Sequence, residues 1–528
     1  MSPKYLRPLY FSLVLVLGVY LGSRLSFSSS GSGISFSPSS MAKFEQLLRF
    51  IQRDYVDVVN TDSLLDNTIQ EMLNKLDPHS TYINPKDMPA ITENMQGNFD
   101  GIGVEFSIQN DTVVVVSAIS GGPSEAQGIR AGDRIIAVEG ESIAGIGLKN
   151  EEVIRTLRGE RGTKVKVTIF RPQEKRSWDV TITRGKIPIY SVDAAYMIRT
   201  NIGYIRVNRF AESTFEEFQK AMTDLLSKGM QSLILDLRGN PGGYLTMATD
   251  MADDFLIDKQ LIVYTEGRKR EKQHFYATDK GLFENGKLVI LIDEGSASAS
   301  EIVAGAIQDN DRGTIIGRRS FGKGLVQEQW MLKDGSALRL TVARYYTPTG
   351  RCIQRTYANG ADEYYSYGNS YHDSIMPIVE DSTEYVTPGG KIVYGGGGIM
   401  PDIEIPFEHD GRSDTYYTVV TSTMIQDFTF QYADKNRTRL MDDLGMEKWL
   451  SGSKYQDDLY SAFSAHYRKE RNELLSLPAN ERSRITNRLA ALVSRNVWGS
   501  VGYFTAMNMH DEMIDAAIKE LLSEQVAE

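Results

Sequence analysis

Two short stretches of the chain carry side chains suited to acyl-transfer chemistry. The first, DEGSASASE, covers residues 293–301 and follows the apolar segment KLVILI. We predict a strand that ends at Ile292 and a helix that begins near Ser298, so this serine lies where backbone N–H groups lack helical partners. Such amides, together with the helix dipole, stabilise a negatively charged oxygen. The pattern also fits a serine that only caps the helix, and this stretch alone leaves both interpretations open.

The second stretch, GRRSFGKG, covers residues 317–324 and has the glycine and lysine spacing of a phosphate-binding loop. Such a loop needs Ser or Thr after the lysine to hold magnesium, but Gly324 stands there. The residues that follow, LVQEQWML, alternate as in a strand, whereas a phosphate-binding loop is followed by a helix. In a strand, Lys323, Leu325 and Gln327 point to the same face.

Lys323 is a candidate base for a serine nucleophile. The nearest histidine in the sequence, His274, lies in a polar segment with no obvious acid to orient it. A free lysine has a pKa of about 10.4 and is charged at neutral pH, but burial lowers that pKa. Phe321 and Leu325 provide apolar neighbours, and Gln327 is placed to orient the amine. A solvated lysine without a catalytic role is the alternative.

The elements around both stretches predict an α/β core with a mostly parallel sheet over residues 187–407. SLILDL and KLVILID are short and almost wholly apolar, which is typical of strands buried on both faces. STFEEFQKAMTDLLSKG is typical of a helix that starts with a capping box, Ser213 and Glu216, and ends at Gly229. The loops RGNPGG and EGSASAS then follow strands, at the sheet edge where functional loops are expected.

A smaller β-rich domain is predicted over residues 99–186, and it resembles a PDZ domain. The resemblance lies in the loop GIGV and in GIRAGDRIIAVEG. It implies that the loop binds the terminal carboxylate of a peptide and that the peptide adds as a strand to the sheet edge. On this resemblance the peptide-binding amides belong to Ile102, Gly103 and Val104.

Five motifs together resemble the carboxyl-terminal processing (tail-specific) proteases, which are exported serine endopeptidases with an inserted PDZ domain. The motifs are LDLRGNPGG, GSASASEIVAGAIQDN, FGKGLVQ, TVARYYTPTGRCIQ and GIMPDI. The resemblance implies a catalytic Ser298, Lys323 as general base and Gln327 as supporting group. It also implies an oxyanion hole made by the amide of Ala299 and that of Gly243, with Gly242 as the alternative.

The fold class implied is an α/β multidomain protein: an α/β serine protease core with an inserted β-rich PDZ domain and helical N- and C-terminal regions. The function implied is cleavage of exported proteins that are recognised by their C-terminal tails. The rival interpretations are a catalytically inactive PDZ adaptor on a protease-like scaffold and a nucleotide-binding protein.

The N-terminal residues predict export. Lys4 and Arg7 precede the apolar run LYFSLVLVLGVYLG, a pattern typical of an export signal. We predict a signal anchor or signal peptide over 1–24 and a flexible Ser/Gly linker over 25–40. An uncleaved anchor is favoured, with the catalytic part in the periplasm, and helices are expected over 41–98.

The amino-acid composition limits the classes of molecule that this protein is expected to bind. The net charge of −11 argues against a general nucleic-acid binder. Cys352 is the single cysteine and the six histidines are scattered, so no disulfide, metal site or cofactor is expected. The expected partners are peptide or protein substrates, with a homo-oligomer or an activating adaptor protein possible. A Tyr-rich insertion at 355–394 and a helical C-terminal extension at 408–528 have no assigned role.

Overall fold

The computed structural model describes residues 38–366, 383–407 and 411–523. The predicted signal anchor and nearly all of the predicted linker therefore lie outside the described residues. Within the described part, none of the helices combines the length and the apolar character needed to cross a membrane.

The chain divides into two units, residues 1–69 and 70–528. The first contains α2 (Pro38–Asp54) and the start of α3 (Thr61–Asn74). The second contains the protease-like core, the PDZ-like domain and the C-terminal helices.

A six-stranded sheet forms the centre of the core. Its spatial order is β10-β11-β12-β15-β16-β21. Only β10 runs antiparallel to its neighbour, and the other pairs are parallel, which confirms the predicted α/β core. The strands are β10 (Val192–Arg199), β11 (Ile202–Val207), β12 (Ser232–Asp236), β15 (Lys287–Ile292), β16 (Thr314–Gly317) and β21 (Ile403–Glu404).

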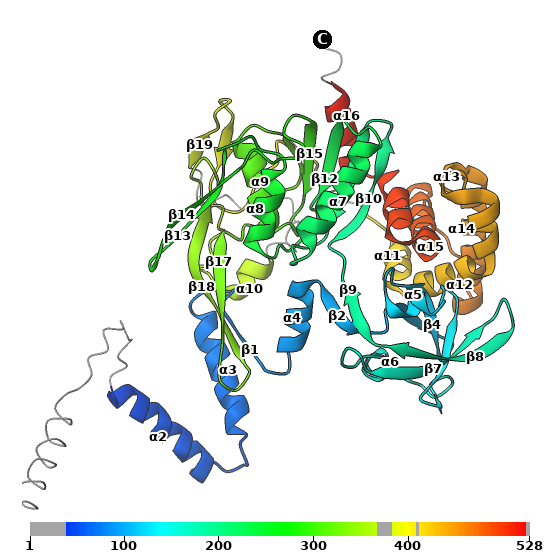
Figure 1. Cartoon of the computed structure of the whole chain (residues 1–528), viewed down its shortest axis with the longest axis horizontal. Coiled ribbons are helices and arrows are strands. Elements are labelled where there is room, and N and C mark those ends of the chain that lie inside the picture. The colour runs from blue at the N-terminus through cyan, green and yellow to red at the C-terminus, as the bar shows by residue number, and fades with distance from the viewer. Residues whose placement is uncertain (1–37, 367–382, 408–410, 524–528) are drawn as a thin grey trace, which may run out of the picture. The chain divides into compact units, whose positions relative to one another are not determined.

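Helices cover both faces of this sheet (Figure 1). Successive side chains of a strand point to opposite faces, so Leu233 and Leu235 pack against one helical layer while Ile234 packs against the other. The first layer consists of α7 (Thr214–Ser227), α8 (Leu245–Asp253) and α9 (Ala299–Asp309). The second face is covered by α16 (Glu512–Ser523), a helix from the far C-terminal part of the chain.

A second, antiparallel sheet lies beside the core and carries the segment after Lys323. Its order is β1-β18-β13-β14, and β17 pairs with β18. The strands are β1 (Thr81–Ile83), β13 (Leu261–Gly267), β14 (Arg270–Tyr276), β17 (Leu325–Met331) and β18 (Ala337–Tyr346). The strand predicted after Lys323 is thus confirmed, and a register shift after Val326 interrupts its pairing.

The PDZ-like domain has its own apolar core and its own sheet, in the order β3-β4-β5-β7-β8, with β6 paired to β5. The strands β2 (Asn98–Gly101) and β9 (Gly185–Pro188) pair with each other where the chain enters and leaves this domain, as expected for an inserted domain. Its elements are β3 (Val104–Gln109), β4 (Thr112–Ala118), α5 (Pro123–Ala126), β5 (Arg134–Val138), β6 (Glu141–Ser142), α6 (Asn150–Leu157), β7 (Lys164–Arg171) and β8 (Arg176–Thr183).

The C-terminal helices before α16 pack around a separate apolar cluster that includes Trp449, Phe463 and Leu489. They are α11 (Asp414–Thr421), α12 (Met424–Thr438), α13 (Gly445–Ser451), α14 (Ser453–Arg471) and α15 (Ala479–Asn508), with a π-helical turn, η2 (Arg439–Leu444). The remaining elements are α4 (Met88–Gln96), α10 (Ala361–Ser366), β19 (Glu384–Val386) and β20 (Ile392–Tyr394).

Candidate active site

Ser298 lies at the junction between a strand and a helix. The strand β15 ends at Ile292 and α9 begins at Ala299, as predicted. The backbone of Ser298 has φ 55° and ψ −111°, a conformation that costs a non-glycine residue about 1–3 kcal/mol and that often marks a functional site. A strained turn of this kind at a strand–helix junction presents a nucleophile in many hydrolases.

The three serines of the SASAS run have different surroundings. Ser296 Oγ donates to the carbonyl oxygen of Leu237 at 2.8 Å, and Ser300 Oγ donates to that of Asn240 at 2.9 Å. Both side chains are buried and fasten the turn to the loop that follows β12. Ser298 is half-buried and lines an open cleft of about 700 Å³. Of the three, the middle serine is therefore the one available to a substrate.

The loop after β12 brings the peptide N–H groups of Gly242 and Gly243 close to the Ser298 turn. Gly242 N–H donates to Asn240 Oδ1 at 2.9 Å. Among the residues that the structure describes, the N–H groups of Gly243 and Ala299 have no hydrogen-bond partner. A Cβ atom on Gly242 would lie 2.9 Å from the Ala299 nitrogen, so the loop backbone lies directly beside the turn. A Cβ on Gly243, at φ 152°, would lie 2.0 Å from the Phe210 carbonyl oxygen, so glycine is required there.

Glu301 joins the serine turn to the lysine loop. Its carboxylate accepts the N–H of Ser298 at 2.8 Å, the N–H of Gly322 at 2.6 Å and the N–H of Lys323 at 2.9 Å. Ser320 Oγ donates to the same carboxylate at 2.5 Å. Burial raises the pKa of Glu301, and these hydrogen bonds oppose that rise. Sequence reasoning missed this role, because a Glu three residues after a helix-capping position is also the ordinary capping-box pattern.

The amine of Lys323 lies in the same cleft as Ser298. Its Nζ donates to Gln327 Oε1 at 3.1 Å, so the structure brings together the two residues that the sequence paired. Burial lowers the pKa of Lys323, and the nearby guanidinium of Arg339 lowers it further. Both causes favour the neutral amine that a base requires.

The amide nitrogen of Gln327 is also fixed by a hydrogen bond. Its Nε2 donates to the backbone carbonyl of His79. Asp77 fixes that turn, because its Oδ1 accepts the N–H groups of His79 and Ser80, each at 2.8 Å. Nothing in the sequence around His79 indicates this contact, which is made by a backbone oxygen about 250 residues away from Gln327 along the chain.

Part of the Tyr-rich insertion of residues 355–394 lies beside the lysine loop. The rings of Tyr364 and Phe321 meet edge to face with centroids 5.4 Å apart, and Tyr364 Oη is 2.8 Å from His79 Nε2. Residues 367–382 of the insertion lie outside the described part of the chain.

The predicted peptide-binding residues of the PDZ-like domain line a second cavity. Ile102, Gly103 and Val104 border a space of about 320 Å³ together with Ile154 and Leu157 of α6. In the described part of the chain, the N–H groups of Ile102 and Gly103 have no hydrogen-bond partner. The cavity therefore has an apolar wall and two free donors at one end.

Family models match most of the second unit and the N-terminal region. Peptidase family S41 matches residues 201–361, and the PDZ domain matches residues 101–182. The N-terminal domain of the activating protease CtpB matches residues 23–87, and a family of unknown function matches residues 415–499.

Several similar proteins are named carboxy-terminal processing proteases. A carboxy-terminal-processing protease of Bartonella bacilliformis is 38% identical over 65% of this chain and 80% of that protein. The chain belongs to the carboxy-terminal processing protease family. The carboxy-terminal processing protease CtpB of Bacillus subtilis is 34% identical over 62% of this chain and 69% of its own length.

Among solved structures, a photosystem II D1 C-terminal processing protease is similar to this chain, with 27% sequence identity and a TM-score of 0.36. The alignment covers 70% of this chain and 93% of that protease. The PDZ domain of a carboxy-terminal protease from Vibrio cholerae, solved with a peptide, is 33% identical over 17% of this chain and 97% of its own, with a TM-score of 0.16. Like other members of its family, this carboxy-terminal processing protease is a serine-type peptidase.

Proposed function

We propose that this peptidase cleaves peptide bonds by a Ser-Lys mechanism in which Ser298 is the nucleophile and Lys323 the general base. The observation that carries the proposal is the state of the Lys323 amine. The Lys323 side chain is half-buried, its amine donates to a neutral amide, and it lines the cleft onto which Ser298 opens. The described residues around this amine offer no histidine–carboxylate pair as an alternative base, because His79 is engaged with Tyr364.

The chemistry follows from these positions. Neutral Lys323 takes the Oγ proton while Ser298 Oγ bonds to the substrate carbonyl carbon, and the carbonyl oxygen becomes an oxyanion. The free N–H groups of Ala299 and Gly243 are the donors for that oxyanion. Lys323 then returns the proton to the leaving amine, and a water molecule attacks the acyl-enzyme with the same base. Gln327 keeps the amine directed at the cleft.

We further propose that the PDZ domain binds the C-terminal tail of the substrate. The free amides of Ile102 and Gly103 suit a terminal carboxylate, and the apolar wall of Ile154 and Leu157 suits an apolar last side chain. The substrates are thus proteins or peptides with an apolar C-terminus.

The test compares the parent with Ser298→Ala on an unfolded protein that carries an apolar C-terminal tail. Fragments are identified by mass spectrometry. We expect cleavage by the parent and none by Ser298→Ala. Cleavage by both would exclude Ser298 as the nucleophile, and intact substrate with both, at normal tail affinity, would favour the inactive PDZ adaptor.

Two further proposals concern location and assembly. The pattern of residues 1–24 supports export, with an anchor in the inner membrane and the catalytic part in the periplasm. Fractionation with protease accessibility in intact and opened cells tests this.

The helix α2 has exposed apolar side chains at every third position, namely Met41, Phe44, Leu47 and Phe50. This exposed apolar row supports a second copy of the chain as a partner. Sedimentation analysis of Leu47→Asp against the parent tests the assembly.

A further inference from the structure

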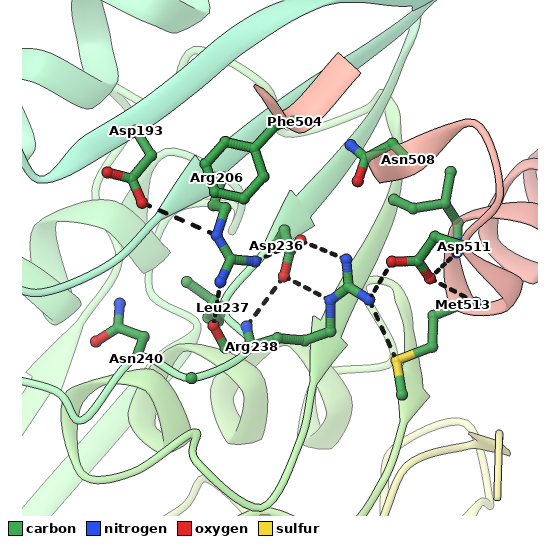
Figure 2. Close-up of polar contacts among 12 residues, drawn as sticks. Asp193, Arg206, Asp236, Leu237, Arg238, Asn240, Phe504, Asn508, Asp511 and Met513 are labelled. Atoms are coloured by element: carbon green, nitrogen blue, oxygen red, sulfur yellow. Dashed lines mark hydrogen bonds and ion pairs between the residues drawn. The ribbon is translucent and has the colours of Figure 1, made fainter. Parts of the chain in front are cut away.

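Asp511 links the C-terminal helix α16 to the loop of the active site. One carboxylate oxygen, Oδ1, accepts the N–H groups of Met513 and Ile514 at 2.9 and 3.3 Å, so Asp511 caps the start of α16. The other oxygen, Oδ2, accepts Nη1 of Arg238 at 2.7 Å. Figure 2 shows this carboxylate facing the guanidinium of Arg238, which comes from the loop after β12.

The guanidinium of Arg238 is held between two carboxylates. Its Nε and Nη2 donate to Asp236 at 2.9 and 2.7 Å, a two-pronged pair, and its Nη1 donates to Asp511 (Figure 2). Bidentate pairs of this kind fix the orientation of the guanidinium plane as well as its position. Arg238 is therefore clamped on both sides, and one of the two sides belongs to the C-terminal segment.

The single negative charge of Asp236 does not balance the two guanidinium charges that contact it. It is fully buried and also accepts Arg206 Nη1 at 2.8 Å, so two guanidiniums share it. Burial by itself would raise the pKa of Asp236, but Arg238 and Arg206 outweigh it and hold that pKa well below the usual range. Each arginine has a second carboxylate nearby: Asp193 at 3.9 Å from Arg206, and Asp511 at 2.7 Å from Arg238. Removing Asp511 leaves Arg238 with only a shared counter-charge in a poorly solvated site.

The loop that runs from Arg238 to Gly243 is anchored by several hydrogen bonds. Arg238 carbonyl oxygen accepts Arg206 Nη2 at 2.9 Å, and Gly239 N–H donates to Asp293 Oδ1 at 2.7 Å. Asn240 Nδ2 donates to the Val207 carbonyl oxygen at 3.0 Å. Arg238 is thus the first of several anchors that place this loop, and the N–H group of Gly243 lies at its end.

We propose that Asp511 is a positioning residue for the oxyanion loop, so that α16 is part of the catalytic unit. This inference rests on the proposed role of the Gly243 amide. Asp511 acts through Arg238 and does not touch the substrate. The consequence is that charge loss at residue 511 weakens the binding of an oxyanion while it leaves tail recognition in the PDZ domain unchanged.

The test uses the full chain with Asp511→Ser and Asp511→Asn. Both replacements keep an oxygen that caps α16 and remove the negative charge. The matched control is Asp515→Ser, because Asp515 is exposed on the same helix and forms no ion pair within the described residues. The measurements are kcat, KM, the affinity for a peptide aldehyde, the affinity for a tail peptide and the unfolding temperature.

A peptide aldehyde reports on the oxyanion directly. Ser298 Oγ bonds to the aldehyde carbon, its proton passes to Lys323, and the carbonyl oxygen becomes the anion of a hemiacetal. We expect both Asp511 variants to lose about tenfold or more in kcat and in aldehyde affinity, since one lost oxyanion donor costs about 10²–10³. KM and tail-peptide affinity stay within about twofold, and Asp515→Ser matches the parent throughout.

Each other outcome contradicts the inference. Unchanged kcat and aldehyde affinity in folded Asp511→Asn would overturn it, as would a loss of unfolding temperature with normal kcat per folded molecule. If Asp511→Ser does not fold, Arg238→Lys provides the second test, since it removes the two-pronged pair and should lower aldehyde affinity in the same way. A parent that is inactive, or as active as Ser298→Ala, would instead reject the proposed mechanism on which the inference rests.

Discussion

Lys323 Nζ and Gln327 Oε1 lie 3.1 Å apart, and the other end of the Gln327 amide is bonded to the backbone of His79. That second bond fixes which atom of the amide faces the amine, because the carbonyl of His79 can only accept. Lys323 therefore meets a neutral acceptor. A neutral acceptor orients the amine and, unlike a carboxylate, adds no full negative charge that would hold the proton on it.

The first prediction changes that acceptor. Gln327→Glu places a carboxylate against Lys323, which raises the pKa of the lysine and keeps it protonated. We expect kcat/KM at pH 7 to fall by about tenfold or more and the pH profile to move to higher pH. Full pH–rate profiles check this. Gln231→Glu, at an exposed position just before β12, is the control, and an unmoved profile in Gln327→Glu would reject the role of Gln327.

The second prediction concerns Lys323, the proposed base. Because burial lowers the pKa of Lys323, kcat/KM should rise with pH and reach its plateau below the usual lysine pKa of about 10.4. Lys323→Arg should lower kcat by about 10²-fold or more, since arginine keeps its proton. A Lys323→Arg enzyme with substantial activity would rule out this lysine as the base.

The same shift makes a third prediction, about stability. Between the lowered native pKa of Lys323 and its usual value, the unfolded chain holds the proton and the folded chain does not. The free energy of unfolding therefore rises with pH across this window. Urea unfolding at a series of pH values should show a steeper rise for the parent than for Lys323→Met, which has no proton to release. Parallel curves would mean that the native pKa is unshifted.

The fourth prediction tests Glu301, the acceptor that joins the Ser298 turn to the Lys323 loop. Glu301→Gln replaces one carboxylate oxygen by an NH₂ group that faces backbone donors. We expect a loss of about 2–3 kcal/mol in unfolding free energy together with a fall in kcat. Urea unfolding and steady-state kinetics measure both. Glu212→Gln, at an exposed site, should change neither, and a Glu301→Gln enzyme with normal kcat would show that the loops hold their positions without this carboxylate.

The fifth prediction separates tail binding from catalysis. Ile154→Asp introduces a charge into the apolar wall of the PDZ cavity, so the affinity for an apolar tail peptide should fall about tenfold or more. Thr156→Asp adds the same charge to the same helix on an exposed position and serves as control. Calorimetry with a tail peptide measures both. Equal affinities would place the tail elsewhere.

The core and the strands and helix that flank Ser298 and Lys323 were predictable because local sequence patterns indicate them. Short apolar strands mark a parallel sheet, and the strand after Lys323 followed from alternation alone. The partners of the loops at the candidate site were not predictable. Asp511 is an ordinary acidic residue before a helix, and the acceptor at His79 is a backbone oxygen, which leaves no trace in residue type. Such contacts depend on which distant segments the fold brings together.

The position of α16 in the chain gives the order of synthesis a consequence. This helix covers one face of the core sheet, and it is made roughly 100 residues after β21, the last strand of that sheet. Synthesis proceeds at about 5–20 residues per second, so α16 is made about 5–20 s after the last strand of the sheet. That face of the sheet is not covered by α16 during this time. During that interval Ile234 is exposed and Arg238 lacks Asp511. Until α16 has been made and has packed on the sheet, Arg238 therefore lacks one of its two carboxylate partners.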